Sequence, residues 1–182
     1  MKHVAIVIGM AVLLGAAALQ AQSPAPTPGP EHKKLEIWVG DWTYEQENKA
    51  TPLGPAEKFS AMATARPVLG GFFVEWLGEA KRPAGTFHWL LIDGYDVLNK
   101  KFMYNSFDSD GSFETAAYTI EANTVNISGT SFLGEKQYKF RGSIVFAPDL
   151  MSFVEKREVS VDGKTWMPQF EAKWTRTKSS QK

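Results

Sequence analysis

Two charged residues interrupt an apolar strand face near the C-terminal end of the chain. The segment Leu150–Val161 alternates apolar and polar positions, which is typical of a β-strand with one buried face. Glu155 and Arg157 fall on the apolar side of that pattern. A buried charge is costly unless it pairs or meets a ligand, and an inward Arg157 would suit a carboxylate ligand through bidentate hydrogen bonds. The alternatives are a structural ion pair, or a bulge that turns both charges outward.

His88 is a second candidate for chemistry. It lies in the predicted strand Thr86–Tyr95, on the same face as Leu90 and Ile92. If the preceding strand is its neighbour, Glu75 would complete an acid–base pair of the kind that an isomerase or hydrolase uses. The alternative is a structural histidine that only makes a hydrogen bond. No cysteine and no spaced set of His, Asp and Glu accompanies His88, so no zinc site is predicted.

Small residues among aromatic ones predict a cavity between the strands. Ala61, Ala63 and Ala65 share a strand face with Phe59, where a filled core would call for larger side chains. Facing aromatic residues that fill the space are the alternative, because alternation of large and small residues is ordinary core packing. The predicted ligand-binding lining is Trp42, Phe59, Ala63, Phe72, Trp76, Trp89, Phe140, Phe153, Arg157 and Trp174, although Trp42 and Trp174 could instead seal one end.

Short strands must position these side chains. A helix is predicted over residues 31–39, with Pro30 at its first turn and Gly40 at its end. From Trp42 to Arg176 the period changes to two, and turn signals recur every 8–14 residues, so about ten strands are predicted. Asp93-Gly94, Asp108–Gly111 and Asp162-Gly163 are interpreted as turn chemistry. Sequential hairpins favour an all-β, antiparallel up-and-down barrel, with a sandwich as the alternative.

The N-terminal region has the layout of a secretory signal peptide. Lys2 precedes an apolar run that ends in small residues, and cleavage is predicted after Ala21. Residues 22–30 are predicted to be a Pro-rich linker, residues 31–176 the barrel domain and residues 177–182 a polar tail. The apolar run is shorter than the roughly 20 residues that a spanning helix needs, so no membrane span is predicted after cleavage. The chain has no cysteine, and a bacterial periplasmic or secreted location fits best.

The charge balance excludes one class of partner. The chain has 20 basic and 20 acidic residues, whereas a nucleic-acid-binding protein normally carries a concentrated basic surface. No nucleic-acid partner is therefore predicted, and the oligomeric state is left open.

Several boxes resemble a known family in their order along the chain. These are Leu35-x-x-Trp-Val-Gly-Asp-Trp-x-Tyr-Glu45, Leu69-Gly-Gly-Phe-Phe-Val-Glu75, Gly94-Tyr-Asp96, Asp108-Ser-Asp-Gly111 and Trp174-x-Arg176. Together they resemble the bacterial domain-of-unknown-function family 1579, over residues 31–176. The resemblance implies a lipocalin-like, calycin-type barrel and no established activity.

A haem-binding barrel of the nitrobindin type is also similar around Gly40-Asp-Trp42. That type needs later glycines in its box and a histidine late in the chain, and this sequence has neither. No haem and no other cofactor is predicted. The sequence thus predicts an exported barrel that binds a small hydrophobic molecule without transforming it. The alternatives are an enzyme that uses His88, or a filled structural or protein-binding barrel.

Overall fold

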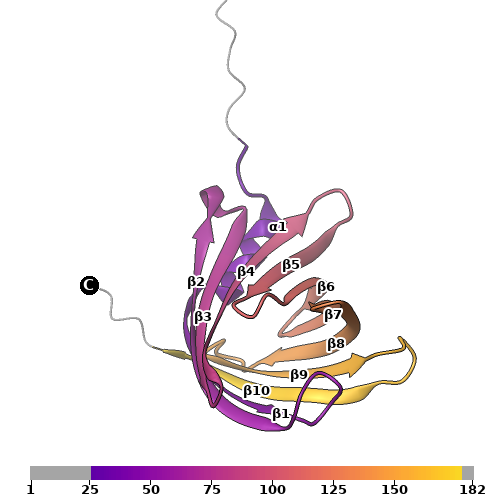
Figure 1. Cartoon of the computed structure of the whole chain (residues 1–182). Helices are drawn as coiled ribbons and strands as arrows, with labels where there is room; N and C mark the ends of the chain where they lie inside the picture. Colours follow the sequence, from indigo (N-terminus) through magenta and orange to yellow (C-terminus); the bar gives the residue numbers. More distant parts are fainter. Residues whose placement is uncertain (1–25, 178–182) are drawn as a thin grey trace, which may run out of the picture.

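A computed structural model describes residues 26–177 and contains a closed barrel of ten antiparallel strands (Figure 1). Each strand pairs with the next along the chain, and β1 pairs with β10, so the predicted up-and-down barrel with one short N-terminal helix is confirmed. The strands are β1 (Gly40–Asn48), β2 (Glu57–Val68), β3 (Phe73–Arg82), β4 (Gly85–Asp96), β5 (Lys101–Asp108), β6 (Phe113–Glu121), β7 (Thr124–Leu133), β8 (Lys136–Phe146), β9 (Ser152–Ser160) and β10 (Met167–Thr177).

A helical segment closes one end of the barrel. It consists of α1 (Pro30–Lys33) followed by the 3-10 helix η1 (Lys34–Trp38), and in Figure 1 it lies beside β4. Pro30 occupies the first turn, where its missing N–H costs nothing. Leu35 and Trp38 are buried, and the Trp38 ring contacts aromatic rings of β3, β6, β8 and β9. This segment therefore forms the floor of the barrel.

Gly40 and Arg176 join the floor to the barrel wall. Gly40 has a φ of 152°, and the Arg176 side chain lies 3.3 Å from the point where a Cβ would stand. The Arg176 guanidinium lies 4.6 Å from the centre of the Trp42 ring and donates a 2.8 Å hydrogen bond to the carbonyl of Ile37. Trp42 in turn donates its indole N–H to the carbonyl of Trp38 at 2.8 Å. The first and last sequence boxes are thus parts of one architectural clamp.

The interpretation of Asp93-Gly94 as a turn is wrong. β4 continues through both residues to Asp96, and the turn follows at residues 97–100. Gly94 serves packing instead, because the Phe73 ring lies 2.7 Å from the point where a Cβ would stand. Asp93 shares its strand face with Trp89 and points into the barrel.

Small residues of the inner face make room for aromatic rings. The Trp89 ring lies over Gly78, 1.9 Å from where a Cβ would stand. Ala63 and Ala65 are buried beside Trp42 and Trp76, their partners on β1 and β3. Aromatic rings therefore fill the space beside these small residues, as one interpretation of the sequence expected. A cavity also remains above the floor, as the other expected.

The predicted signal peptide of residues 1–21 lies outside the described residues, as do most of the predicted tail and the first part of the linker. Within residues 26–177, no helix is long and apolar enough to cross a bilayer.

Candidate functional site

The inside of the barrel contains an open cavity of about 1010 Å³. Its mouth is formed by the loop between β1 and β2, the β3–β4 hairpin and the β5–β6 turn. At the rim, Arg82 pairs with Glu57 and lies over the rings of Phe59 and Phe87, at 5.0 and 5.5 Å from the ring centres. Trp38 lies at the opposite, closed end. The volume is at the upper end of what is usual for small-molecule pockets.

Aromatic side chains form much of the cavity wall. Tyr44 and Trp174 stack with ring centres 3.9 Å apart, and Phe153 stacks on Trp174 at 5.2 Å. Trp76 meets Trp174 edge-on at 5.8 Å, and Trp89 meets Tyr44 edge-on at the same separation. Such packed rings hold one another in place, so the apolar wall is largely formed before any ligand arrives.

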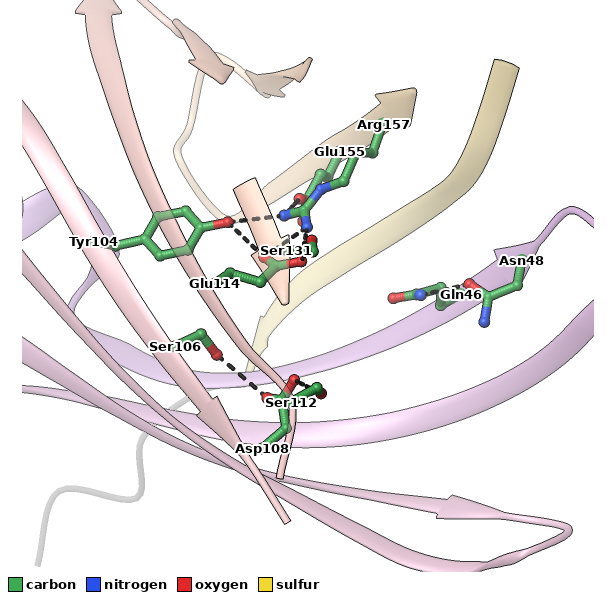
Figure 2. A network of polar contacts seen from close by, with 10 residues as sticks. All are labelled: Gln46, Asn48, Tyr104, Ser106, Asp108, Ser112, Glu114, Ser131, Glu155 and Arg157. Carbon is green, nitrogen blue, oxygen red and sulfur yellow. Dashed lines mark hydrogen bonds and ion pairs between the residues drawn. The ribbon is translucent and has the colours of Figure 1, made fainter. Parts of the chain in front are cut away.

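A polar network crosses the wall between β5, β6 and β9 (Figure 2). Arg157 donates to both carboxylate oxygens of Glu114, at 3.0 and 2.8 Å, and to Glu155 at 3.0 Å. Tyr104 donates its hydroxyl proton to Glu114 at 2.8 Å, and Ser131 donates to the same carboxylate at 2.6 Å. The guanidinium is also sandwiched between the Phe140 and Phe170 rings, at 4.4 and 4.9 Å from their centres. Glu155 and Arg157 thus both point into the barrel and are paired. This arrangement agrees with the alternative of a structural ion pair.

The contacts around Arg157 shift the pKa values of Glu114, Glu155 and Arg157 itself. Burial alone would raise the pKa of Glu114, but the Arg157 charge and the hydroxyl donors hold it below its usual value. Burial raises the pKa of Glu155, and Arg157 offsets that only in part. The pKa of Arg157 stays well above its usual range against the opposing effect of burial, because Glu114 and Glu155 surround it. Arg157 is therefore permanently charged, and carboxylates of the wall already occupy its donors.

Asp93 forms a second polar site at the closed end of the cavity. It is 4% exposed and accepts hydrogen bonds from the Trp76 indole at 2.8 Å and the Tyr118 hydroxyl at 2.7 Å. Tyr118 in turn accepts a 3.2 Å hydrogen bond from the indole of Trp38. Burial raises the pKa of Asp93 to about 7, although the two donors oppose this. A carboxyl group that titrates near neutrality therefore faces the deep cavity.

A third polar group lies nearer the mouth, in the lower part of Figure 2. Asp108 accepts hydrogen bonds from Ser112 at 2.9 Å and from Ser106 at 3.3 Å. Burial raises its pKa to about 6. Gln46 and Asn48, which are joined by a 2.6 Å hydrogen bond, also line the mouth. The cavity wall is thus aromatic over much of its surface, with polar groups at both ends and the Arg157 network on one side.

Six of the ten side chains predicted to bind a ligand line the cavity. They are Phe59, Trp76, Trp89, Phe153, Arg157 and Trp174. The period-two pattern of each strand had placed these six side chains on the inner face of the barrel.

The other four predicted lining residues do not reach the cavity wall. Trp42 belongs to the floor clamp, and Ala63 is buried beside it. Phe140 is 1% exposed behind the Arg157 guanidinium. Phe72 precedes β3 and packs edge-on against His32 of α1, with ring centres 5.0 Å apart. These four are structural neighbours of the site.

His88 and Glu75 lie on the outer face of the barrel. His88 is the register partner of Glu79, whose carboxylate lies 3.8 Å from the His88 ring; His88 is exposed and Glu79 is partly exposed. Glu75 is paired with Ile92, four positions further along β4. The structure therefore does not bring His88 and Glu75 together, and neither faces the cavity, so an acid–base pair of these two residues inside the barrel is wrong.

The sequence interpretation missed the polar residues that do line the cavity. Glu114 and Tyr118 share the inner face of β6, and Tyr104 lies on the inner face of β5. Their signal was present, since Glu114 alternates in phase with Ala116 and Tyr118. Asp93 was not predicted to line the cavity because Asp93-Gly94 was interpreted as a turn. Within residues 26–177, no three His, Cys, Asp or Glu side chains are grouped so as to hold a metal ion.

Comparisons with known proteins agree with this architecture. The structure of Rv2717c from M. tuberculosis is similar, with a TM-score of 0.60 and 10% identity, over 82% of this chain and 99% of that one. The S-type phycobiliprotein lyase CPES from Guillardia theta is similar with a TM-score of 0.55 and 13% identity, over 82% of this chain and 93% of that one. At such identities these likenesses concern the fold alone. A search among curated proteins found no match.

The model of the family described as "Protein of unknown function (DUF1579)" matches residues 27–176, which include every strand up to Arg176 in β10. The ordered boxes from Leu35 to Arg176 all lie within that range. The chain therefore belongs to the DUF1579 family.

Proposed function

We propose that this protein binds a small, mainly apolar molecule inside the barrel and does not transform it. The observation that carries the proposal is the open, aromatic-walled cavity of about 1010 Å³. A purely structural barrel would be expected to fill its interior with side chains, because protein cores are normally close-packed. The polar groups at the two ends would orient the ligand, as is usual in small-molecule sites.

A carboxylate head group is not the ligand chemistry that this wall favours. Arg157 was the predicted anchor for a carboxylate, but Glu114 and Glu155 already occupy its donors. A ligand carboxylate would have to displace one of them and leave its charge buried, which costs several kcal/mol. The proposed ligand is therefore neutral or positively charged at its polar end.

Binding is favoured over catalysis because the residues proposed for catalysis face solvent. His88 lies outside the barrel with Glu79. The S-type phycobiliprotein lyase shares this fold, but at 13% identity it assigns neither a ligand nor a reaction here.

We also propose that the protein is exported to the periplasm or beyond, on the strength of the charged, apolar and small-residue regions of residues 1–21. Fractionation of the native host followed by N-terminal sequencing tests this. A mature chain that begins at Gln22 supports export, and an uncleaved cytoplasmic chain refutes it.

Binding is tested by purifying the protein from its native host and examining bound molecules by mass spectrometry. A panel of neutral, cationic and anionic hydrophobes is then titrated while tryptophan fluorescence is followed. Leu91→Trp places an additional indole in the cavity, whereas Ile92→Trp places it on the outer face of the same strand. We expect the first variant to lose about tenfold or more in affinity and the second to bind within about threefold of the wild type. An empty protein that ignores the whole panel overturns the proposal.

A further inference from the structure

The cavity wall carries an excess of acidic groups. Six carboxyl side chains line it against three basic ones, and two of the three basic groups, Arg82 and Arg157, are already paired with wall carboxylates. The electrostatic potential of such a wall attracts cations and repels anions, most strongly in a low-dielectric interior.

Asp93 is the deep carboxyl group that lacks a basic partner. Its partners within residues 26–177 are the Trp76 indole and the Tyr118 hydroxyl, which are neutral donors. Tyr104 is its register neighbour on β5 and is turned toward the Arg157 network. A carboxylate has room for about four hydrogen bonds, so two acceptor sites remain on Asp93.

The surroundings of Asp93 suit a cation with an apolar body. Trp76 and Tyr118 meet Asp93 through their N–H and O–H groups, the Trp38 ring packs against both, and the faces of such rings attract ammonium groups. The same barrel already holds one cation in this way, since Arg157 lies between the Phe140 and Phe170 rings.

Trp174 borders the deep cavity beside Trp76 and is 9% exposed. Burial raises the pKa of the Glu155 carboxyl group, and the Trp174 indole N–H acts on that carboxylate to oppose the rise. This donor is therefore directed at the wall and leaves the Asp93 end of the cavity free.

We propose that the closed end of the cavity binds the protonated amine of an apolar, aromatic ligand, with Asp93 as its counter-ion. This inference rests on the proposed binding function and adds the chemical class of the ligand. The ammonium would donate to the free acceptor sites of Asp93 among the rings, and the apolar body would lie along the Trp76–Trp174 wall toward the mouth.

The test compares three probes that share a body and differ in the head group. Naphthylmethylamine, naphthylmethanol and naphthoate are titrated calorimetrically into the full protein at pH 8. We expect the amine to bind about tenfold or more tightly than the alcohol, and the carboxylate to bind most weakly. Asp93→Asn should bring the amine to within about threefold of the alcohol and leave the alcohol unchanged. Glu79→Gln, which removes a carboxylate from the outer face, is the matched control and should preserve the preference.

Each outcome decides a separate question. An amine that binds wild-type protein no better than the alcohol overturns the proposal, whether or not Asp93→Asn folds. A preference that survives in a folded Asp93→Asn protein also overturns it. If other hydrophobes of the panel bind while the amine does not, the amine proposal fails and the binding function stands. If nothing in the panel binds, both fail.

Discussion

Removing the Asp93 carboxyl group should change how stability depends on pH. Burial raises the pKa of Asp93 to about 7 from an ordinary value of 3.8. Between these values the folded state binds a proton that the unfolded state has released, so stability falls as pH rises. The full difference corresponds to about 4 kcal/mol, and about 2.5 kcal/mol of it falls between pH 5 and pH 8.

Asp93→Asn cannot titrate, so the comparison with wild type isolates this group. Asparagine keeps one acceptor for the Trp76 and Tyr118 donors and loses the other, which lowers stability by a similar amount at every pH. The difference in unfolding free energy should therefore move in favour of the variant by about 2.5 kcal/mol from pH 5 to pH 8. Other groups, such as Asp108 with its pKa of about 6, titrate in both proteins and cancel.

The assay is urea unfolding of both proteins at several pH values, followed by far-UV circular dichroism. Linear extrapolation gives each unfolding free energy, and the slope shows whether the unfolding remains comparable between the two proteins. Parallel stability curves from pH 5 to pH 8 would refute the reasoning, because they would mean that Asp93 ionises as easily in the folded protein as in water.

Three further outcomes are expected. Arg157→Met strips two buried carboxylates of their counter-charge and should cost about 3–5 kcal/mol in urea unfolding, whereas Arg141→Met at an exposed ion pair should cost about 1 kcal/mol or less; equal losses would contradict this. Gly78→Ala forces the overlying indole to move and should cost about 1–3 kcal/mol with an altered near-UV spectrum, while Gly54→Ala, with open space around it, should change neither. His88→Gln should leave ligand affinity within about twofold, and a larger loss would show that the outer face matters.

Alternation along the strands predicts the barrel and most of its inner face. Each residue of a strand points to the side opposite its neighbours, so Phe59, Trp76 and Trp174 could be placed inside from the sequence alone. Phe72 was misplaced because Leu69, Gly70 and Gly71 all have positive φ, and strand β3 starts only after this turn. Val74 and Trp76 point inward as predicted, but the alternation does not extend back to Phe72, which lies outside the strand.

The polar network is harder to predict because alternation does not say which inward residues meet. Arg157 and Glu114 are 43 residues apart and belong to strands that do not pair with each other, yet their side chains are joined by a 2.8 Å contact. Their meeting depends on barrel curvature, which brings the inner faces of β6 and β9 toward each other across β7 and β8. Asp93 was missed for a local reason, since Asp-Gly is a common turn dipeptide.

The pairing of β1 with β10 also constrains how the chain folds. The Thr177 hydroxyl donates to the carbonyl of Asp41 at 3.1 Å across a separation of 136 residues. The seam formed by β1 and β10 runs from Asp41 to Asn48 of β1. Such distant pairing costs much loop-closure entropy, so the final step of folding should be slow compared with the formation of the hairpins. During synthesis the ring cannot close until its last strand has emerged. The seam also brings the domain's two ends together, so a circular permutant that links them and opens a hairpin tip elsewhere should regain the same ring.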